Sequence, residues 1–273
     1  MPELPEVETI RRTLAEHVSG RTIKAVELYW PDAVVSWGNL GFTEIVSGRM
    51  IEGLGRRGKY LLFGLSGGWT LVAHMRMTGR LLYYKQAELP AKHTHVLFRL
   101  DQGELHFNDV RKFGRLVAVP TSEHLLLPSL AKLGPEPLES VFTPEVFSQR
   151  LGTQKRPIKS ALLDQEVVAG LGNIYADEAL FLAHVNPWRP GHSLNEREIQ
   201  ALHGAIVKVL RAGIAAQGTS FRDYRDANGE KGAFQEQLYV YGRAGKPCRD
   251  CGRPLEKGRL GGRTTVFCPR CQH

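Results

Sequence analysis

The chain has 273 residues and a formal net charge of +8 at pH 7, and this length suits two domains with room for a small appendage. No apolar run approaches the roughly 18 residues that a membrane-spanning helix needs, and the first twenty residues lack the basic start and apolar stretch of a signal peptide. We therefore expect a cytoplasmic protein without a membrane span.

The first helix is predicted from the spacing of apolar residues near the N-terminus. Apolar side chains recur every three or four residues between Pro5 and Val18, which places them on one face of a helix. Pro5 suits a first helical turn, and Glu6 and Glu8 lie where the helix dipole favours negative charge. The pattern predicts a packed helix over residues 5–18.

Helix formation does not account for Pro2 and Glu3, which precede this helix. Nothing in helix capping requires a proline at the second position. Removal of Met1, which a small second residue permits, would leave the ring nitrogen of Pro2 as a terminal secondary amine. The residues alone leave Glu3 open to an ordinary interpretation as a solvated terminal acid.

A series of short strands is predicted after the first helix. The segments are rich in Val, Ile, Leu, Phe and Tyr, and glycine or charged turns separate them. So many short strands without intervening helices indicate a sandwich or a barrel. The expected strands are 22–30, 49–55, 58–65, 69–77, 94–100, 104–109 and 114–119.

Helices are predicted in the second half of the chain, beyond a proline-rich linker at residues 120–137. Residues 159–183 have the pattern of two helices broken at the GLGN stretch, 170–173. Ser193 and Glu196 have the spacing of a capping box for a further long helix. Residues 217–235 have no sustained period and three glycines, so we expect a mobile loop there.

Four cysteines near the C-terminus have the spacing of a metal site. They form two C-x-x-C pairs separated by 16 residues, which lets four thiolates converge on one zinc ion. Two disulfides are the alternative, which a chain without a secretion signal rarely keeps. Four thiolates leave no open coordination position, so the zinc would be structural. The expected ligands are Cys248, Cys251, Cys268 and Cys271.

The same segment is strongly basic. Residues 243–273 carry eight lysines and arginines against two acidic residues. A solvated basic tail is the ordinary interpretation of such a run, but the four cysteines argue for an ordered one. An ordered segment with this charge suits a polyanionic partner.

Six motifs, in order, give the chain a resemblance to a known family. They are PELPEVE at residues 2–8, RRGKYL at 56–61, HMRMTGR at 74–80, DVRKFG at 109–114, VAGLGNIYADE at 168–178 and the four-cysteine finger. Together they closely resemble bacterial formamidopyrimidine-DNA glycosylase, over nearly the whole chain. Each motif alone would be weak, and their combination makes the resemblance specific.

The resemblance implies a multidomain α+β fold and a bifunctional repair enzyme. We expect an N-terminal β-sandwich catalytic domain with flanking helices at 1–130, a helical domain with a helix–two-turn–helix element and a lesion-recognition loop at 131–240, and a zinc finger β-hairpin at 241–273. The implied partner is double-stranded damaged DNA, bound by a monomer. The implied activity is excision of oxidised purines, such as 8-oxoguanine and formamidopyrimidines, followed by strand cleavage through β,δ-elimination.

The family's catalytic groups map onto the first residues of this sequence. The resemblance implies that Pro2 is the nucleophile, which forms a Schiff base with the deoxyribose, and that Glu3 is the essential acid. A terminal α-amine titrates near 7.7–8.0 and a lysine near 10.4, so far more of the terminal amine is unprotonated at neutral pH. Glu6 matches a family acid close to the site, although helix capping explains it equally well.

Other family residues would hold the DNA. Lys59 and Arg263 belong to the implied catalytic site and grip phosphates beside the lesion together with Asn173, whose helix start can also hold phosphate through backbone amides. His74 aligns with a phosphate-contacting histidine. Without the resemblance, Lys59 is an exposed strand lysine and His74 a packed side chain.

The resemblance also implies that the damaged nucleotide is extruded and the gap filled. Met77, Arg111 and Phe113 match the three gap-filling side chains, and the arginine can meet the orphaned cytosine; as residues of strand ends, Met77 and Phe113 could equally belong to a core. A lid over the extruded base would recognise it through backbone groups. The lid residues are Thr219, Ser220, Phe221, Arg222, Asp223 and Tyr224.

Two rival interpretations remain. An endonuclease eight-type glycosylase shares the nucleophile, acid and finger but prefers oxidised pyrimidines, and PELPEVE and the long lid favour the purine enzyme. A non-catalytic damaged-DNA-binding protein would use the same basic finger, but Pro2 and Glu3 argue against it.

Overall fold

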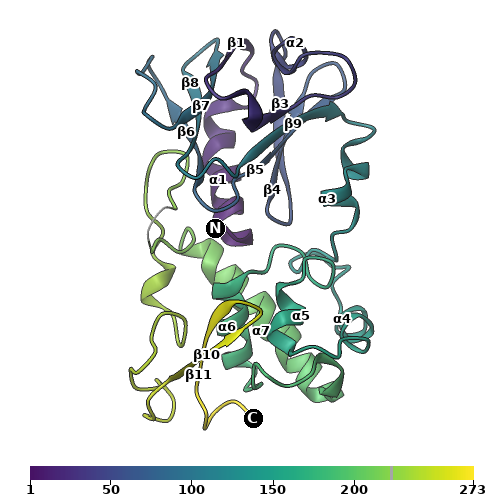
Figure 1. Cartoon of the computed structure of the whole chain (residues 1–273), viewed down its shortest axis with the longest axis vertical. Helices are drawn as coiled ribbons and strands as arrows, with labels where there is room; N and C mark the ends of the chain where they lie inside the picture. Colours follow the sequence, from purple (N-terminus) through teal and green to yellow (C-terminus); the bar gives the residue numbers. More distant parts are fainter. Residues whose placement is uncertain (222–223) are drawn as a thin grey trace. The chain divides into compact units, whose positions relative to one another are not determined.

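The computed structural model describes residues 1–221 and 224–273. The chain divides into two compact units (Figure 1). The first contains residues 1–131 and 216–233, and the second contains residues 132–215 and 234–273. Each unit is described by itself. The loop after residue 215 therefore packs with the first unit, although the chain reaches it from the second.

Helix α1, Leu4–Val18, begins the first unit and confirms the predicted helix. Glu3 is its N-cap, with an extended backbone, and forms a capping box with Glu6. The apolar stripe is buried: Val7, Ile10, Leu14 and Val18 are at most 1% exposed. The helix contacts β3, β4 and β6 of its own unit.

Two β-sheets form the body of the first unit. One sheet has four strands in the order β1-β7-β8-β6, and the other has five in the order β2-β9-β5-β4-β3. All neighbouring strands pair antiparallel except β2 and β9, which are parallel. The strands are β1 (Ile23–Leu28), β2 (Val34–Val35), β3 (Ile51–Arg57), β4 (Tyr60–Leu65), β5 (Trp69–His74), β6 (Gly79–Tyr84), β7 (Thr94–Leu100), β8 (Glu104–Asp109) and β9 (Arg115–Pro120).

The two sheets and α1 share one apolar core, which makes the first unit a β-sandwich with flanking helices, as expected. Buried side chains from both sheets, such as Phe63 and Phe107, belong to the same cluster as Ile10 of the helix.

Two strands of the first unit, β2 and β6, were not predicted. The strand expected at 69–77 ends at His74, a turn follows, and β6 begins at Gly79. Short helical segments complete the unit: η1 (Pro31–Ala33), α2 (Phe42–Val46), η2 (His124–Leu126) and α3 (Pro128–Ala131).

The second unit contains the predicted helices. Nine residues, 164–172, separate α5 from α6 and include most of the GLGN break. Helix α6 contacts α5, α7 and strand β11. The helices are α4 (Pro144–Leu151), α5 (Ile158–Leu163), α6 (Asn173–Leu182) and α7 (Glu196–Ala215), with the 3-10 turns η3 (Gly191–Ser193) and η4 (Phe234–Glu236).

The N-terminal cap of α7 differs from the prediction. The backbone N–H of Glu198 donates to Asn195 Oδ1 at 3.0 Å, and the N–H of Asn195 donates to Glu198 Oε2 at 2.8 Å. Ser193 instead lies in η3, and its hydroxyl donates to the carbonyl of Pro190. The predicted Ser193–Glu196 box was wrong because Asn195 offers an equally good cap with an acid at the same spacing.

A β-hairpin near the C-terminus confirms the expected finger. Strands β10, Glu256–Leu260, and β11, Arg263–Phe267, pair antiparallel through a two-residue turn. Gly261 and Gly262 both have positive φ, +52° and +74°, which a two-residue turn of the I′ type requires and only glycine adopts readily. Arg263 follows the turn directly and thus lies at the hairpin tip.

Residues 216–221 and 224–233 form neither helix nor strand. The segment is tied to the first unit near its middle, where the carbonyl of Ala227 accepts the N–H of Tyr83 on the edge strand β6 at 3.0 Å. His17 of α1 also hydrogen-bonds Asn228 at 2.9 Å. The expected domain limits at residues 130 and 240 remain a prediction, because the two compact units are each made of two separate segments and do not correspond to three consecutive domains. Among the described residues, no helix has the length and apolar character that would let it span a membrane.

Candidate active site and nucleic-acid interface

The N-terminus of the first unit is packed. Met1 is 42% exposed, whereas Pro2 is buried and Glu3 is 4% exposed. The alternative interpretation of Glu3 as a solvated terminal acid is therefore wrong, because the residue is buried and its backbone N–H donates to Glu6 Oε2. Pro2 and Glu3 are thus two consecutive buried residues directly before the first residue of α1.

Glu6 joins this terminus to the loop segment. Its Oε2 accepts the backbone N–H of Glu3 at 2.9 Å, and its Oε1 accepts the N–H of Thr219 at 2.7 Å. Glu6 is 2% exposed. Helix capping therefore explains only one of its two oxygens.

Lys59 and His74 are both buried, and Lys59 lies close enough for its charge to influence the pKa of His74. Lys59, in the turn between β3 and β4, is 6% exposed, and His74 at the end of β5 is 7% exposed. Burial lowers the pKa of His74 to about 3, and the charges of Arg76 and Lys59 act in the same direction. His74 is therefore neutral at pH 7. Its Nδ1 accepts the N–H of Arg76 at 2.9 Å, so the ring proton is on Nε2 and is available for donation.

The three predicted gap-filling side chains lie on two turns. Met77 is half-buried in the turn between β5 and β6, and Arg111 and Phe113 are exposed in the turn between β8 and β9. Phe113 is 49% exposed, and the Arg111 guanidinium lies 4.8 Å from the centre of its ring. The core methionine of this region is Met75, which is 1% exposed. Met77 and Phe113 are therefore not part of the core.

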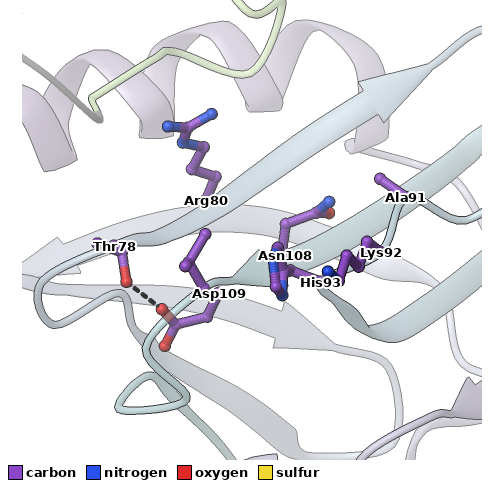
Figure 2. A pocket seen from close by; sticks show the side chains of 8 residues that line it. Thr78, Arg80, Ala91, Lys92, His93, Asn108 and Asp109 are labelled. Carbon is purple, nitrogen blue, oxygen red and sulfur yellow. Dashed lines mark hydrogen bonds between the residues drawn. The ribbon is translucent and has the colours of Figure 1, made fainter.

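Asp109 holds these two turns together, and its importance was missed in the sequence. Its Oδ1 accepts the hydroxyl of Thr78 and the N–H of Arg111, and its Oδ2 accepts the N–H of Gly114 at 2.7 Å. Figure 2 shows the bond between Thr78 and Asp109. Asp109 is 1% exposed. An aspartate followed by a turn was the available signal, because this side chain readily binds backbone N–H groups ahead of it.

A pocket of about 260 Å³ lies beside these turns. Thr78 and Asp109 line it together with Arg80 of β6 and the segment Ala91–His93 that precedes β7 (Figure 2). Arg80 and Lys92 bring two positive charges to the pocket, and Asp109 brings one negative charge. Such a pocket can accept an anion next to the exposed Arg111.

The predicted recognition loop is described at its ends. Thr219 is 4% exposed, Ser220 accepts the N–H of Gly232 at 3.0 Å through its hydroxyl, and Phe221 is 51% exposed. Tyr224 belongs to the sandwich core, and burial, followed by the nearby Glu6, raises the pKa of its hydroxyl. Two members of the predicted lid, Arg222 and Asp223, lie outside the described residues.

The second unit brings Asn173 and the hairpin tip together. Asn173, the first residue of α6, donates to the carbonyl of Thr264 at 3.2 Å. The same carbonyl accepts the ammonium of Lys159 at 2.9 Å. Thr264 directly follows Arg263, which is exposed. These contacts hold Asn173 next to the residue that follows Arg263, so the two phosphate-gripping residues predicted in this unit lie close together.

A buried ion pair supports this arrangement and was also missed. Lys159 and Asp177 are both 0% exposed, with Nζ and Oδ1 2.7 Å apart. Asp177 Oδ2 accepts the N–H of Val266 on β11 at 3.2 Å. Burial raises the pKa of Asp177 to about 7, and Lys159 acts in the opposite direction. The sequence offered a lysine and an acid on separate helices, with nothing to pair them.

The four cysteines converge as predicted. Their sulfur atoms all lie within 4.8 Å of one another, with 3.9 Å between Cys248 and Cys271 and 3.4 Å between Cys251 and Cys268. Four sulfurs at about 2.3 Å from a tetrahedral zinc would be about 3.8 Å apart. The cysteines form no disulfide among the described residues. The geometry fits one structural zinc and rules out the pair of disulfides.

Three domain families match successive parts of the chain. Residues 1–116 match the formamidopyrimidine-DNA glycosylase N-terminal domain, residues 133–225 match the formamidopyrimidine-DNA glycosylase H2TH domain, and residues 245–273 match the zinc finger found in FPG and IleRS. These matches agree with the sandwich, the helices and the finger.

Whole proteins are similar over the full length. The formamidopyrimidine-DNA glycosylase of Desulfitobacterium hafniense is 57% identical to this chain, and the alignment covers 100% of both proteins. The formamidopyrimidine-DNA glycosylase of Desulforamulus reducens is 50% identical, and the alignment covers 100% of this chain and 99% of the relative. The crystal structure of MutM (Fpg) from Thermus thermophilus has a TM-score of 0.90 at 44% identity, covering 99% of this chain and 98% of that one. Lactococcus lactis Fpg in complex with abasic-site DNA has a TM-score of 0.92 at 38% identity, covering 99% of both chains. The buried proline-led N-terminus, the helical unit with its zinc finger and these full-length matches establish that the chain belongs to the formamidopyrimidine-DNA glycosylase family of DNA repair enzymes.

Proposed function

We propose that this enzyme excises oxidised purines, including 8-oxoguanine and formamidopyrimidines, from duplex DNA and then cleaves the abasic strand. The observation that carries the proposal is the N-terminus, where a buried Pro2 stands directly before the buried acid Glu3 at the start of α1. Once Met1 is removed, the ring nitrogen of Pro2 is a terminal amine with an acid beside it. A monomer suffices, because both residues belong to one chain.

The chemistry follows from that amine. The nitrogen of Pro2 attacks C1′ of the deoxyribose, the bond from C1′ to the base breaks, and Glu3 transfers a proton as the sugar ring opens. A secondary amine then gives a charged iminium at C1′. This electron sink permits elimination first of the 3′ phosphate and then of the 5′ phosphate. Base removal and strand cleavage thus follow from one intermediate.

Four residues are proposed to hold the DNA backbone. Lys59 and Arg263 supply positive charge, Asn173 supplies an amide, and neutral His74 supplies the N–H of Nε2. The half-burial of Met77 and the exposure of Arg111 and Phe113 support their proposed role in filling the gap left by the extruded nucleotide. The segment around Thr219 to Tyr224 is proposed to cover the extruded base.

The decisive experiment is borohydride trapping with a duplex that contains 8-oxoguanine opposite cytosine. The protein lacking Met1 should form a covalent adduct, and a preparation shown by mass spectrometry to retain Met1 should bind the duplex without excision or trapping. Trapping by the Met1-retaining protein would refute the role of Pro2.

Parallel substrates separate the rival functions. A preference for a duplex with an oxidised pyrimidine would favour the endonuclease eight-type activity. Binding without an adduct on any damaged duplex would favour a damage-recognition protein.

A further inference from the structure

Glu6 uses its two carboxylate oxygens for two different parts of the first unit. Oε2 holds the N–H of Glu3, the residue that follows Pro2, and Oε1 holds the N–H of Thr219, 213 positions later in the chain. One side chain, 2% exposed, therefore fixes both the backbone beside the proposed nucleophile and the beginning of the proposed recognition loop.

The loop lies directly against this carboxylate. Gly218 has φ +84°, and a Cβ at this position would lie 2.9 Å from Glu6 Cγ and 3.0 Å from Oε1. Beyond the two undescribed residues, the hydroxyl of Tyr224 lies 3.5 Å from the carbonyl of Glu6. Both ends of the recognition segment thus contact the same residue of α1.

We infer that Glu6 is a positioning residue that couples recognition of the extruded base to the placement of Pro2. The inference rests on the proposed function and deepens it. When backbone groups of the loop bind the base, Thr219 is held in place and keeps the carboxylate oriented toward Glu3. A wrong base that displaces the loop also loosens the backbone beside Pro2, since a coupling between two sites acts in both directions.

A carboxylate suits this position because the backbone groups of Glu3 and Thr219 that it binds are both N–H donors. A glutamine has one acceptor oxygen, and a capping box accepts glutamine as well as glutamate at this position. In a Glu6→Gln variant the amide oxygen therefore keeps the bond to Glu3. The amide NH₂ then faces the N–H of Thr219, donor against donor. The substitution separates the loop from the nucleophile and leaves the start of α1 capped.

The test compares two single-turnover rates of each variant, 8-oxoguanine excision from a duplex and cleavage of a duplex with a preformed abasic site. Glu6→Gln should lower excision about tenfold to hundredfold, as expected for one lost bond to a charged acceptor. Abasic cleavage needs no base recognition and should stay within about threefold of the unsubstituted protein. Glu16→Gln, an exposed acid on the same helix, should leave both rates unchanged.

Gly218→Ala tests the loop side of the same contact. The added methyl group pushes the loop away from Glu6 while the carboxylate remains, so the same selective loss of excision is expected. Equal losses of both rates in Glu6→Gln, or undiminished excision, would overturn the inference. Failure of the proposed function is visible separately, because the unsubstituted protein itself would then not excise 8-oxoguanine.

Discussion

The two units use buried acids in the same way but in different surroundings. In the first, Glu6 and Asp109 accept backbone N–H groups of loops that lie against a large core shared by two sheets and α1. In the second, Glu178 accepts three N–H groups of residues 239–241 at 2.7–2.9 Å, next to a small apolar cluster that includes two of the cysteines.

This difference shows what each acid can stabilise. The sandwich has a large buried apolar cluster, so we expect its stability to depend on that cluster more than on the loop contacts of its acids. The hairpin has little core of its own, so the zinc ion and the buried polar contacts determine its position. Loss of a zinc ligand or a buried polar contact in the second unit should therefore reduce stability and DNA binding more than loss of a buried acid in the first unit.

The largest expected effect is loss of the zinc. Cys251→Ser should abolish zinc binding, DNA binding and excision, because Arg263 and the other hairpin cations lose their placement together. Hydrogen exchange should increase across residues 234–273 and stay unchanged in the strands of the sandwich. Zinc per chain, DNA affinity and exchange are measured on one preparation. Tight DNA binding by the zinc-free variant would contradict the view that the zinc ion holds the hairpin in position for binding DNA.

The next largest effect concerns the buried pair of the second unit. Lys159→Met leaves Asp177 buried without its partner, which should destabilise this unit by about 3–5 kcal/mol. The double variant Lys159→Met/Asp177→Leu should recover most of the loss, since it removes both charges. Urea unfolding with residue-resolved hydrogen exchange measures the change. Lys155→Met, at an exposed position, is the control. A double variant as unstable as the single one would show that an unpaired buried charge on Asp177 is not the cause of the loss.

A smaller effect is expected in the first unit. Burial would raise the pKa of Glu8, but hydrogen bonds from Arg11 and Arg12 and the charge of Arg56 outweigh it and lower the pKa to about 2. Glu8→Gln should cost about 2 kcal/mol at pH 7, with allowance for screening at the exposed Arg12.

The pH dependence of this cost follows from the sign of the shift. A folded pKa below the unfolded value of 4.5 means that Glu8 stabilises the fold above pH 4.5 and loses this effect as the pH falls toward 2. Urea midpoints at pH 7, 4 and 3 should therefore converge for the variant and the unsubstituted protein. Glu16→Gln is the matched control. A difference at pH 3 as large as that at pH 7 would show that packing, not charge, is responsible.

The smallest effect separates one contact from the metal that positions it. Arg263→Ala should keep its zinc and lower the slope of log affinity against log salt by about one, uniformly across sequences. Arg270→Ala, another exposed cation of the same finger, measures the background effect of removing charge. Equal slopes for the Arg263 and Arg270 variants would mean that Arg263 makes no special phosphate contact.

Local patterns determined much of this molecule in advance. The apolar spacing predicted α1, and the predicted limits of 94–100 and 104–109 agree with β7 and β8 to the residue. The two C-x-x-C pairs predicted the cysteine cluster. These features are recognisable because helix period, strand composition and knuckle spacing depend on residues close together in the chain.

Contacts between distant residues were decided only by the tertiary structure. Glu6 meets Thr219, Lys159 meets Asp177, and Asp109 meets Thr78 across a pair of turns. An acid on a helix surface has the same local pattern whether it faces solvent or a backbone N–H from another element. Its partner is set by how the sheets and helices pack, because that packing excludes water and leaves the buried oxygen with only the donors that the fold brings to it.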